Sequence, residues 1–424
     1  MGKEYGIEWK EDGISKRTAS SFSAFFNIVC AVAGAGALGL PYSLRDGGWI
    51  SLAFFLLAAV LSTFTAKQLI ECLYYKEGER LEEMADIGEA AFGMFGRYFV
   101  KVFNYSISLS FACIFILLSG HNAYNIVNEA MGYVVIQEAY WTVLAGFIIL
   151  VPFALLKTLK EVSFLALFGV LTTVVVVFIV IIVGGIDYAS STTSVETTLL
   201  RVEGIPLALS TIAYCYGGNV VYPHVEATMR HPESWNKVMV YATICITVIF
   251  VSAGGAGYLY FGDEVQSPVL DSLPRGLATT MGYILITVHV ILAAPIYLCS
   301  FALDQERWLN IDTMHLTVTS EFVKRLILRT SIVGVLTLIA VYIPYFSDLV
   351  SLVGAVSNCI IIFLVPTVCH YKLFGYRNRK MHDYLLSALV ILIALIGLTF
   401  GSYSAMTNLI LHIKTGQAAA PKAH

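Results

Sequence analysis

Eleven long apolar stretches dominate this 424-residue sequence and restrict what it can fold into. A helix of about 20 apolar residues crosses the hydrocarbon core of a bilayer. Continuous runs such as LTTVVVVFIVIIVGG exclude the alternating strands of a membrane β-barrel. Only 13% of the residues are charged, roughly half the share of soluble domains. The sequence therefore predicts an all-α polytopic membrane protein with spans at 20–44, 47–74, 98–127, 139–156, 161–186, 204–229, 236–262, 276–303, 325–345, 347–371 and 383–411.

Lysine and arginine are distributed unevenly between the two sides of these spans. With a cytosolic N-terminus, the cytosolic segments hold 20 of them and the opposite side holds five, leaving out Lys67 within the second span. Cytosolic loops of membrane proteins are enriched in these residues. We therefore predict a cytosolic N-terminal tail (1–19), one transmembrane domain (20–411) and a lumenal or extracellular C-terminal tail (412–424).

Two of the predicted spans contain glycines followed by a proline. Gly36 precedes Pro41 by five residues in the first span, and Gly218 precedes Pro223 by five in the sixth. Glycine adds backbone freedom, and proline removes a hydrogen-bond donor and clashes with the preceding turn. Both spans are therefore expected to unwind inside the membrane. Because five spans separate the breaks, we predict a 5+5 inverted repeat of oppositely oriented halves, 20–186 and 204–371, with one extra helix, 383–411.

An unwound helix inside a membrane exposes backbone groups that can bind a small ligand. One half-helix presents N–H groups and a positive dipole end, and the other presents carbonyls and a negative end, so a zwitterion suits both. We expect a carboxylate on the amides of Gly36, Ala37 and Leu38. Its ammonium would face carbonyls around Ala33 and in the sixth span. The predicted substrate-binding residues are Ala33, Gly34, Ala35, Gly36, Ala37, Leu38, Tyr214, Cys215, Tyr216, Gly217, Gly218 and Asn219.

The glycines of the first span also fit two unrelated patterns. GAGALG matches the dinucleotide-binding fingerprint, but its flanks are membrane spans and no acidic residue follows about 20 residues on. Small residues at three- and four-residue spacing also allow helices to pack closely. The equal spacing from glycine to proline in two separate spans favours the broken helices over packing alone.

Few ionisable residues lie within the predicted spans, and such residues are usually functional, paired or near a helix end. Glu226 is a candidate for proton coupling, and its alternative role is an ion pair with Arg230, four residues on. His224 is a second candidate because histidine titrates near physiological pH. A sodium site would need paired hydroxyls on the eighth span, where AAPIYLCSFAL offers only Ser300. This favours a proton gradient as the driving force, with sodium as the alternative.

Other classes of function find little support in the sequence. The net charge of −3 and the lack of a basic block exclude a nucleic-acid partner. The eight cysteines lie in or beside apolar stretches without metal-binding spacing, so we expect no metal and no cofactor. No nucleophile and base can be assembled, which predicts a protein that is not an enzyme. The expected partners are an amino acid substrate and the lipid bilayer, and the oligomeric state stays open.

Several passages resemble the amino acid/auxin permease family, most closely its vacuolar amino acid transporters and the vesicular inhibitory amino acid transporter. They include LPYSLRDGGW after the first break, DIGEAAFGMFGR before the third span, and AYCYGGNVVYPHVEATMRHP through the sixth. The resemblance implies the leucine-transporter (amino acid-polyamine-organocation) fold and proton-linked movement of amino acids across an endomembrane. It also implies that Gly34–Gly39 and Tyr214–Asn219 line the site. The N-terminal tail is shorter than in many members, which leaves the compartment open.

Combining these observations, we expect a secondary active transporter for small neutral amino acids that works by alternating access. An endomembrane location, vacuolar or lysosomal, is favoured over the plasma membrane. Two alternatives remain: an amino acid sensor on the same fold, and sodium-coupled uptake at the plasma membrane.

Overall fold

A computed structural model describes residues 17, 19–76, 78–131, 136–155, 165–191, 195–311, 317–376 and 380–415. Every element within these residues is helical, apart from one isolated bridge between Ala19 and Met229. The all-α prediction is thus confirmed. Most of the predicted tail 1–19, the end of the tail 412–424 and the first residues of the span 161–186 lie outside the described residues.

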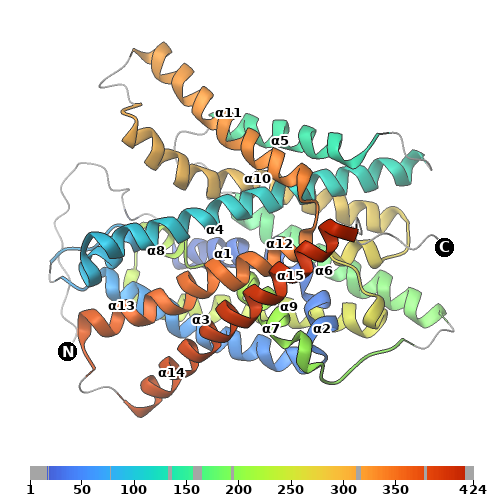
Figure 1. Cartoon of the computed structure of the whole chain (residues 1–424), viewed down its shortest axis with the longest axis horizontal. Coiled ribbons are helices and arrows are strands. Elements are labelled where there is room, and N and C mark those ends of the chain that lie inside the picture. Colours follow the sequence, from blue (N-terminus) through green and yellow to red (C-terminus); the bar gives the residue numbers. More distant parts are fainter. Residues whose placement is uncertain are drawn as a thin grey trace.

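The first half of the chain forms the helices drawn from blue to green in Figure 1. The Ser20 hydroxyl accepts the Ser23 N–H at 3.1 Å and so caps the first of them. A non-helical Gly93 (φ 68°, ψ −158°) separates the first turns of α4 from its membrane-spanning part. The elements are α1 (Ser21–Val32), the 3₁₀ helix η1 (Ala35–Gly39), α2 (Leu40–Gly47), α3 (Ser51–Leu73), α4 (Met84–Met131), α5 (Glu138–Leu155) and α6 (Leu165–Ser190).

The second half continues from green to red in Figure 1. Its main helices are α7 (Ile205–Cys215), α8 (Tyr222–Thr228), α9 (Trp235–Phe261), α10 (Leu277–Trp308), α11 (Val318–Tyr342), α12 (Phe346–Val353), α13 (Val365–Phe374), α14 (Met381–Ile396) and α15 (Ser402–Thr415). Short 3₁₀ helices are η3 (Val202–Gly204), η4 (Pro232–Ser234), η5 (Gly262–Glu264) and η6 (Val269–Ser272). Two π-helical stretches, η7 (Gly354–Leu364) and η8 (Gly397–Gly401), connect α12 to α13 and α14 to α15.

Each predicted span corresponds to one or more of these helices. Within the described residues, eight helices are long and apolar enough to cross a membrane, and the bent pair α1 and α2 makes a ninth. The spans predicted at 139–156 and 204–229 correspond to shorter apolar helices, Glu138–Ala154 and Val202–Cys215. The chain is therefore a polytopic membrane protein, while the count of eleven and the 5+5 repeat remain predictions.

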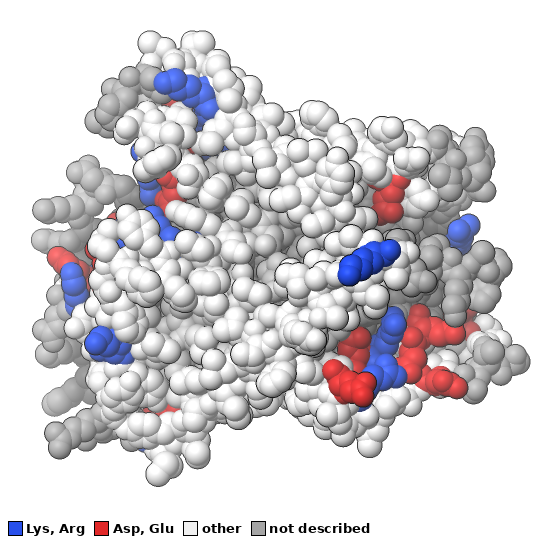
Figure 2. Space-filling model, viewed as in Figure 1, with Lys and Arg blue, Asp and Glu red and all other residues white. Residues whose placement is uncertain are grey.

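The surface agrees with a membrane environment. Large apolar side chains are exposed on many helices, among them Phe147 on α5, Ile186 on α6 and Leu338 on α11, with 63%, 66% and 58% of their surface accessible. Figure 2 shows charged residues gathered mostly towards the two ends of the long axis, with a largely uncharged band between them. A surface of this kind is unfavourable in water and suits the hydrocarbon core of a bilayer.

Close backbone approaches hold α7 in place within the bundle. The two π-helical stretches both pack on this helix. A Cβ atom on Gly354 would lie 1.9 Å from the Ser210 carbonyl oxygen, and one on Gly401 would lie 2.2 Å from the Ser210 Oγ. A side chain at Gly354 would push the α7 backbone away, whereas one at Gly401 would require the Ser210 side chain to move.

This packing predicts a specific stability defect. Gly354→Ala should lower the melting temperature, because overpacking of this kind costs about 1–3 kcal/mol. Gly334→Ala on α11 is the matched control, since a Cβ there would meet nothing within 4 Å. Thermal unfolding of the detergent-solubilised chain, followed by fluorescence size-exclusion chromatography, would measure both. Equal melting temperatures for the two variants would contradict the close contact.

Candidate functional site

The first span is broken where the sequence predicts. Helix α1 ends at Val32, and Gly34 (φ −68°, ψ −131°) departs from helical geometry. Five residues of 3₁₀ helix follow before α2 begins at Leu40, with Pro41 in its first turn. The two halves are bent by 40° relative to each other. The glycine and proline therefore act as expected. Gly34 adopts a non-helical backbone conformation, and Pro41 lacks the N–H that would continue the hydrogen bonding of α1.

The sixth span is broken at the corresponding place. Helix α7 ends at Cys215, and α8 begins at Tyr222 with Pro223 in its first turn. The residues between them, 216–221, are not helical. This break includes Gly217 and Gly218, as the sequence predicts.

The two breaks lie against each other at the centre of the bundle. The Cys215 thiol donates a hydrogen bond to the Gly36 carbonyl at 3.2 Å. A Cβ on Gly36 would lie 3.3 Å from the Cys215 Cα, and one on Gly218 would lie 2.6 Å from the Val32 Cγ2. The glycines thus allow two unwound segments, far apart in the sequence, to make direct contact.

The predicted binding residues are buried within this centre. Those with low exposure are Ala33, Gly34, Gly36, Ala37, Leu38, Tyr214, Cys215, Tyr216, Gly217, Gly218 and Asn219, while the surroundings of the Ala35 side chain lie outside what is described. The structure therefore brings both predicted segments into one place. Their role in binding substrate remains a prediction.

Side chains from two other elements satisfy carbonyls at the breaks. The Asn358 amide in η7 donates to the Ala213 and Tyr214 carbonyls, both at 3.2 Å. The Tyr297 hydroxyl on α10 donates to the Ala31 carbonyl at 3.1 Å. In the opposite direction, the Asn219 amide within the second break donates to the Ile362 carbonyl of η7 at 3.2 Å. These bonds matter because an unpaired backbone group in a membrane costs several kcal/mol.

A stack of three aromatic rings covers one side of the centre. Phe111 on α4 lies between Tyr214 and Tyr297, with ring centroids 4.6 Å and 4.9 Å away and interplanar angles of 13° and 6°. His289 on α10 lies beside the first break, where a Cβ on Gly34 would be 2.9 Å from its Nε2. The wall of the centre is thus aromatic and largely uncharged, and α4, α7 and α10 supply it.

Sequence reasoning missed Asn358, Phe111 and Tyr297. An asparagine inside the otherwise apolar stretch SNCIIIFLV was a usable signal for Asn358, since polar residues in a membrane usually have a partner. Nothing in the sequence distinguishes Phe111 and Tyr297 from the many other aromatic residues of the spans.

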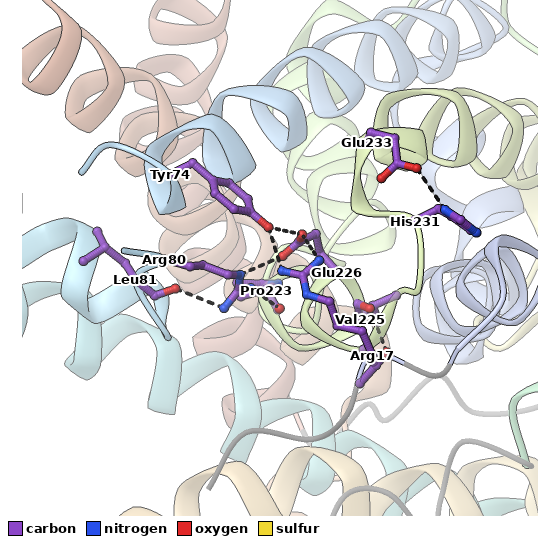
Figure 3. Close-up of polar contacts among 10 residues, drawn as sticks. Arg17, Tyr74, Arg80, Leu81, Pro223, Val225, Glu226, His231 and Glu233 are labelled. Atoms are coloured by element: carbon purple, nitrogen blue, oxygen red, sulfur yellow. Dashed lines mark hydrogen bonds and ion pairs between the residues drawn. The ribbon is translucent and has the colours of Figure 1, made fainter. Parts of the chain in front are cut away.

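Glu226 lies at the predicted cytosolic end of the bundle, within a cluster shown in Figure 3. Its buried carboxylate pairs with Arg80 Nε at 2.8 Å and Arg17 Nη1 at 3.6 Å, and accepts a hydrogen bond from the Tyr74 hydroxyl at 2.5 Å. Arg80 also donates to the Pro223 carbonyl at 2.6 Å. We call Arg17, Tyr74, Arg80 and Glu226 the Glu226 cluster. It joins α8 to the end of α3, the α3–α4 connection and the N-terminal segment.

Two sequence interpretations are affected by this cluster. The alternative pair of Glu226 with Arg230 is not formed among the described residues, where Arg230 is exposed and its N–H donates to the Ala19 carbonyl at 2.8 Å. His224 has an exposed side chain on α8, on a different face from the buried Glu226. In the sequence Arg80 is one of several charged residues in the connection after the second predicted span. No feature of the sequence predicts that it pairs with Glu226.

A separate cavity of about 770 Å³ opens on the side of the bundle. It lies between α3, α9, α13 and α14, and its lining includes none of the predicted binding residues. Its polar residues include Glu71 and His370, whose Oε2 and Nε2 atoms are 2.8 Å apart. This lateral cavity is therefore distinct from the centre where the breaks meet.

The fold and the centre together define a class: all-helical polytopic membrane proteins with a transporter-type fold. The chain belongs to the family of transmembrane amino acid transporter proteins, whose family model matches residues 17–407. It is 27% identical to the amino acid transporter AVT1I of Arabidopsis thaliana over 402 residues, which cover 93% of this chain and 96% of that protein. It is 26% identical to the vesicular inhibitory amino acid transporter of Xenopus laevis, over 95% of this chain and 80% of that one.

Solved transporter structures share the fold. The crystal structure of MhsT in complex with L-phenylalanine has a TM-score of 0.57 and 13% identity, and covers 94% of this chain and 100% of that one. Mhp1, a nucleobase-cation-symport-1 family transporter in a closed conformation, has a TM-score of 0.55 and 12% identity, with 98% of each chain covered. The predicted family is confirmed, and the relatives are transporters, which fits the prediction of a protein that is not an enzyme.

The Glu226 cluster leads to a testable prediction. Glu226→Gln should lower the stability of the solubilised chain by about 3 kcal/mol or more, since removing one partner of a buried ion pair leaves the other uncompensated. Arg230→Gln, which changes an exposed charge outside the cluster, should have little effect. Melting temperatures in detergent would separate the two. A larger loss for Arg230→Gln would favour the pairing that the sequence left open.

Proposed function

We propose that this protein is a secondary active transporter that moves small neutral amino acids, coupled to protons, by alternating access across an endomembrane. The observation that carries the proposal is the direct contact between two broken helices at a buried centre, through Cys215 and Gly36. Membership of the amino acid transporter family supports the same substrate class.

Backbone groups at the breaks would bind the two charged ends of an amino acid. The start of η1 has a positive dipole end, which suits the substrate carboxylate at the amides of Gly36, Ala37 and Leu38. The Ala37 N–H now donates to the Gly34 carbonyl at 3.2 Å, so a carboxylate would replace this bond. The end of α7 presents the carbonyls of Ala213 and Tyr214, which suit an ammonium group. Asn358 now donates to both carbonyls. The substrate ammonium would donate to the same carbonyls, either beside the Asn358 amide or in its place. Because backbone carbonyls bind the ammonium, the site needs no charged side chain.

The walls of the centre favour small, neutral side chains. The stack of Tyr214, Phe111 and Tyr297 is apolar over its faces and tightly closed. None of the predicted binding residues carries a charge, and Glu226 is already paired with Arg80 in its own cluster. A charged substrate side chain would therefore lose its hydration without gaining a counter-charge.

Two contacts favour protons over sodium as the coupling ion. Sodium bound in this architecture would need carbonyl oxygens of the first span. The Tyr297 hydroxyl already donates to one of them, on Ala31. The buried Glu226, in contrast, lies among two arginines and a tyrosine, where a proton could replace an arginine as its partner. Glu226 and His224 remain the candidate coupling residues within the sixth span.

Alternating access requires that each end of the bundle opens in turn. The Glu226 cluster joins three separate segments to α8 and so holds the predicted cytosolic end closed in this conformation. Opening towards the cytosol would break these ion pairs. An endomembrane location is supported by similarity to a vesicular transporter.

The first experiment tests the binding site. Gly36→Leu should reduce uptake of labelled neutral amino acids into proteoliposomes at least about tenfold, because its side chain would displace Cys215 from the centre. Gly255→Leu is the matched control, since a Cβ at that position would meet nothing within 4 Å. Both variants should insert into the membrane in equal amounts. Uptake by Gly36→Leu at the rate of the unaltered chain would refute the site.

A second experiment tests the coupling ion and the alternatives. An imposed pH gradient should drive accumulation of neutral amino acids in proteoliposomes, and a sodium gradient at constant pH should not. Accumulation driven by sodium alone would overturn proton coupling. Saturable amino acid binding without flux under either gradient would favour a sensor.

A further inference from the structure

A second cluster of ionisable groups lies at the end of the bundle opposite the Glu226 cluster. His121, near the end of α4, has its Nδ1 2.8 Å from a Glu138 oxygen at the start of α5. Its Nε2 lies 2.8 Å from an Asp271 oxygen in η6. Asn125 and the Tyr283 hydroxyl on α10 donate to the other Asp271 oxygen, at 3.1 Å and 2.7 Å. One aspartate in a loop is thus held by two helices.

The distances around His121 require an extra proton. A neutral imidazole has one N–H donor and one lone pair, and an ionised carboxylate only accepts hydrogen bonds. Both ring nitrogens lie 2.8 Å from carboxylate oxygens, so a neutral ring would place its lone pair against an anion. The Asn125 amide nitrogen also lies 3.1 Å from Nε2, but a bond from it to that lone pair would leave the closer Asp271 oxygen facing the same lone pair. The arrangement is satisfied only if the ring is an imidazolium or one carboxyl group is protonated. Either state holds one proton more than a neutral histidine with two carboxylates.

Asp271 belongs to a segment that covers the first break. Residues 265–273, which we call the covering segment, include η6, and η6 contacts η1, α2 and α10. Its Val265, Val269 and Leu270 are almost fully buried. Arg45 after the break also reaches this segment, donating to the Val265 carbonyl at 3.5 Å. Releasing Asp271 from α4 and α10 would therefore loosen a cover that lies directly over the candidate site.

We propose that His121, Glu138 and Asp271 form a proton-binding latch, which holds the covering segment over the first break when the proton is bound and releases it when the proton leaves. The charged groups that face the ring are Glu138 from α5 and Asp271 from η6. The neutral Asn125 contacts both the ring and Asp271, and the neutral Tyr283 contacts Asp271. Loss of the proton raises the negative charge of the cluster and places a lone pair against a carboxylate.

The latch deepens the proposed function, because it would link a proton from the non-cytosolic side to access to the amino acid site. This proton is bound at the end of the bundle opposite Glu226. Each end of the bundle therefore has one cluster of ionisable groups. The role in coupling rests on the proposed function, whereas the opening of the covering segment can be measured without transport.

The test measures how accessible the covering segment is at different pH values. Ser267→Cys places a thiol in the segment, at a side chain 3.9 Å from the position of a Cβ on Gly39. Glu203→Cys is the matched control, since Glu203 is exposed in η3, which is predicted to lie on the same side of the membrane. Both single variants of the full chain are reconstituted in proteoliposomes and labelled with a membrane-impermeant maleimide. Dividing one labelling rate by the other cancels the pH dependence of the maleimide reaction and the mixed orientation of the protein in the proteoliposomes. The chain without an added cysteine gives the background labelling.

We expect this labelling ratio to rise at least about fivefold between about pH 6 and about pH 9, as the latch loses its proton, because the two carboxylates favour the charged ring and delay this loss. Asp271→Asn should keep the ratio low at every pH, because an asparagine amide donates to the neutral ring without an extra proton. His121→Gln should also remove the pH dependence, since glutamine does not titrate. Tyr283→Phe removes a hydrogen bond but no titratable partner of the ring, so the pH dependence should persist.

Three results would overturn the latch. The first is a labelling ratio independent of pH when His121 and Asp271 are both unaltered. The other two are a labelling ratio whose pH dependence is unchanged in Asp271→Asn, or unchanged in His121→Gln. If one of these two variants fails to reach the membrane, the pH dependence of the labelling ratio in the other variant decides whether the latch is correct. A ratio that depends on pH together with absent amino acid flux would remove the transport proposal and keep the latch. Proton-driven flux with a ratio independent of pH would remove the latch alone.

Discussion

The need to pair backbone hydrogen-bonding groups inside a bilayer governs this structure. An intact helix satisfies its own N–H and C=O groups, so a break in a membrane helix is stable only where protein, water or ligand replaces those bonds. Here the replacements come from distant parts of the chain. Asn358 donates to two carbonyls at the end of α7, Tyr297 donates to Ala31, and the Cys215 thiol donates to Gly36. The two breaks are therefore stabilised together, and the groups that stabilise them are those that a zwitterionic ligand would compete for.

Close packing around the breaks depends on glycine. Gly36 and Gly218 bring the unwound segments together, and Gly354 brings η7 against α7. The helix that ends in the second break is thus held rigidly, while the unwound residues that follow it are confined by neighbouring side chains. A transporter needs both properties, because a binding site must be preorganised while the elements around it move between two arrangements. Rigid α7 and the hinge at its end provide one physical basis for such motion.

Charged residues meet at both ends of the bundle, and at each end they join separate segments. At one end Glu226 binds Arg80 and Arg17, and at the other His121 joins Asp271 to Glu138. The two clusters differ in their proton requirement. Carboxylate and guanidinium form a pair without any added proton, whereas the histidine between two carboxylates needs one. A pH difference across the membrane would therefore act unequally on the two ends, which is the asymmetry that proton-coupled alternating access requires.

Much of the architecture was predictable from the sequence because its signals are local. A long apolar stretch must form a membrane helix, and glycine followed by proline must weaken it, wherever the rest of the chain lies. The breaks near Gly36 and Gly218 and the family followed from such signals. The partner of Glu226 did not, since Arg230 is near in sequence while Arg80 becomes near only when α3 and α8 pack together. The stack of Phe111 on Tyr214 and Tyr297 and the contacts of His121 are likewise invisible to local patterns. The sequence by itself determined where the helices lie and where they break. Only the tertiary structure decided which side chains satisfy the broken ends and which charges meet, because hydrogen bonds and ion pairs act over a few ångströms between residues that the fold alone brings together.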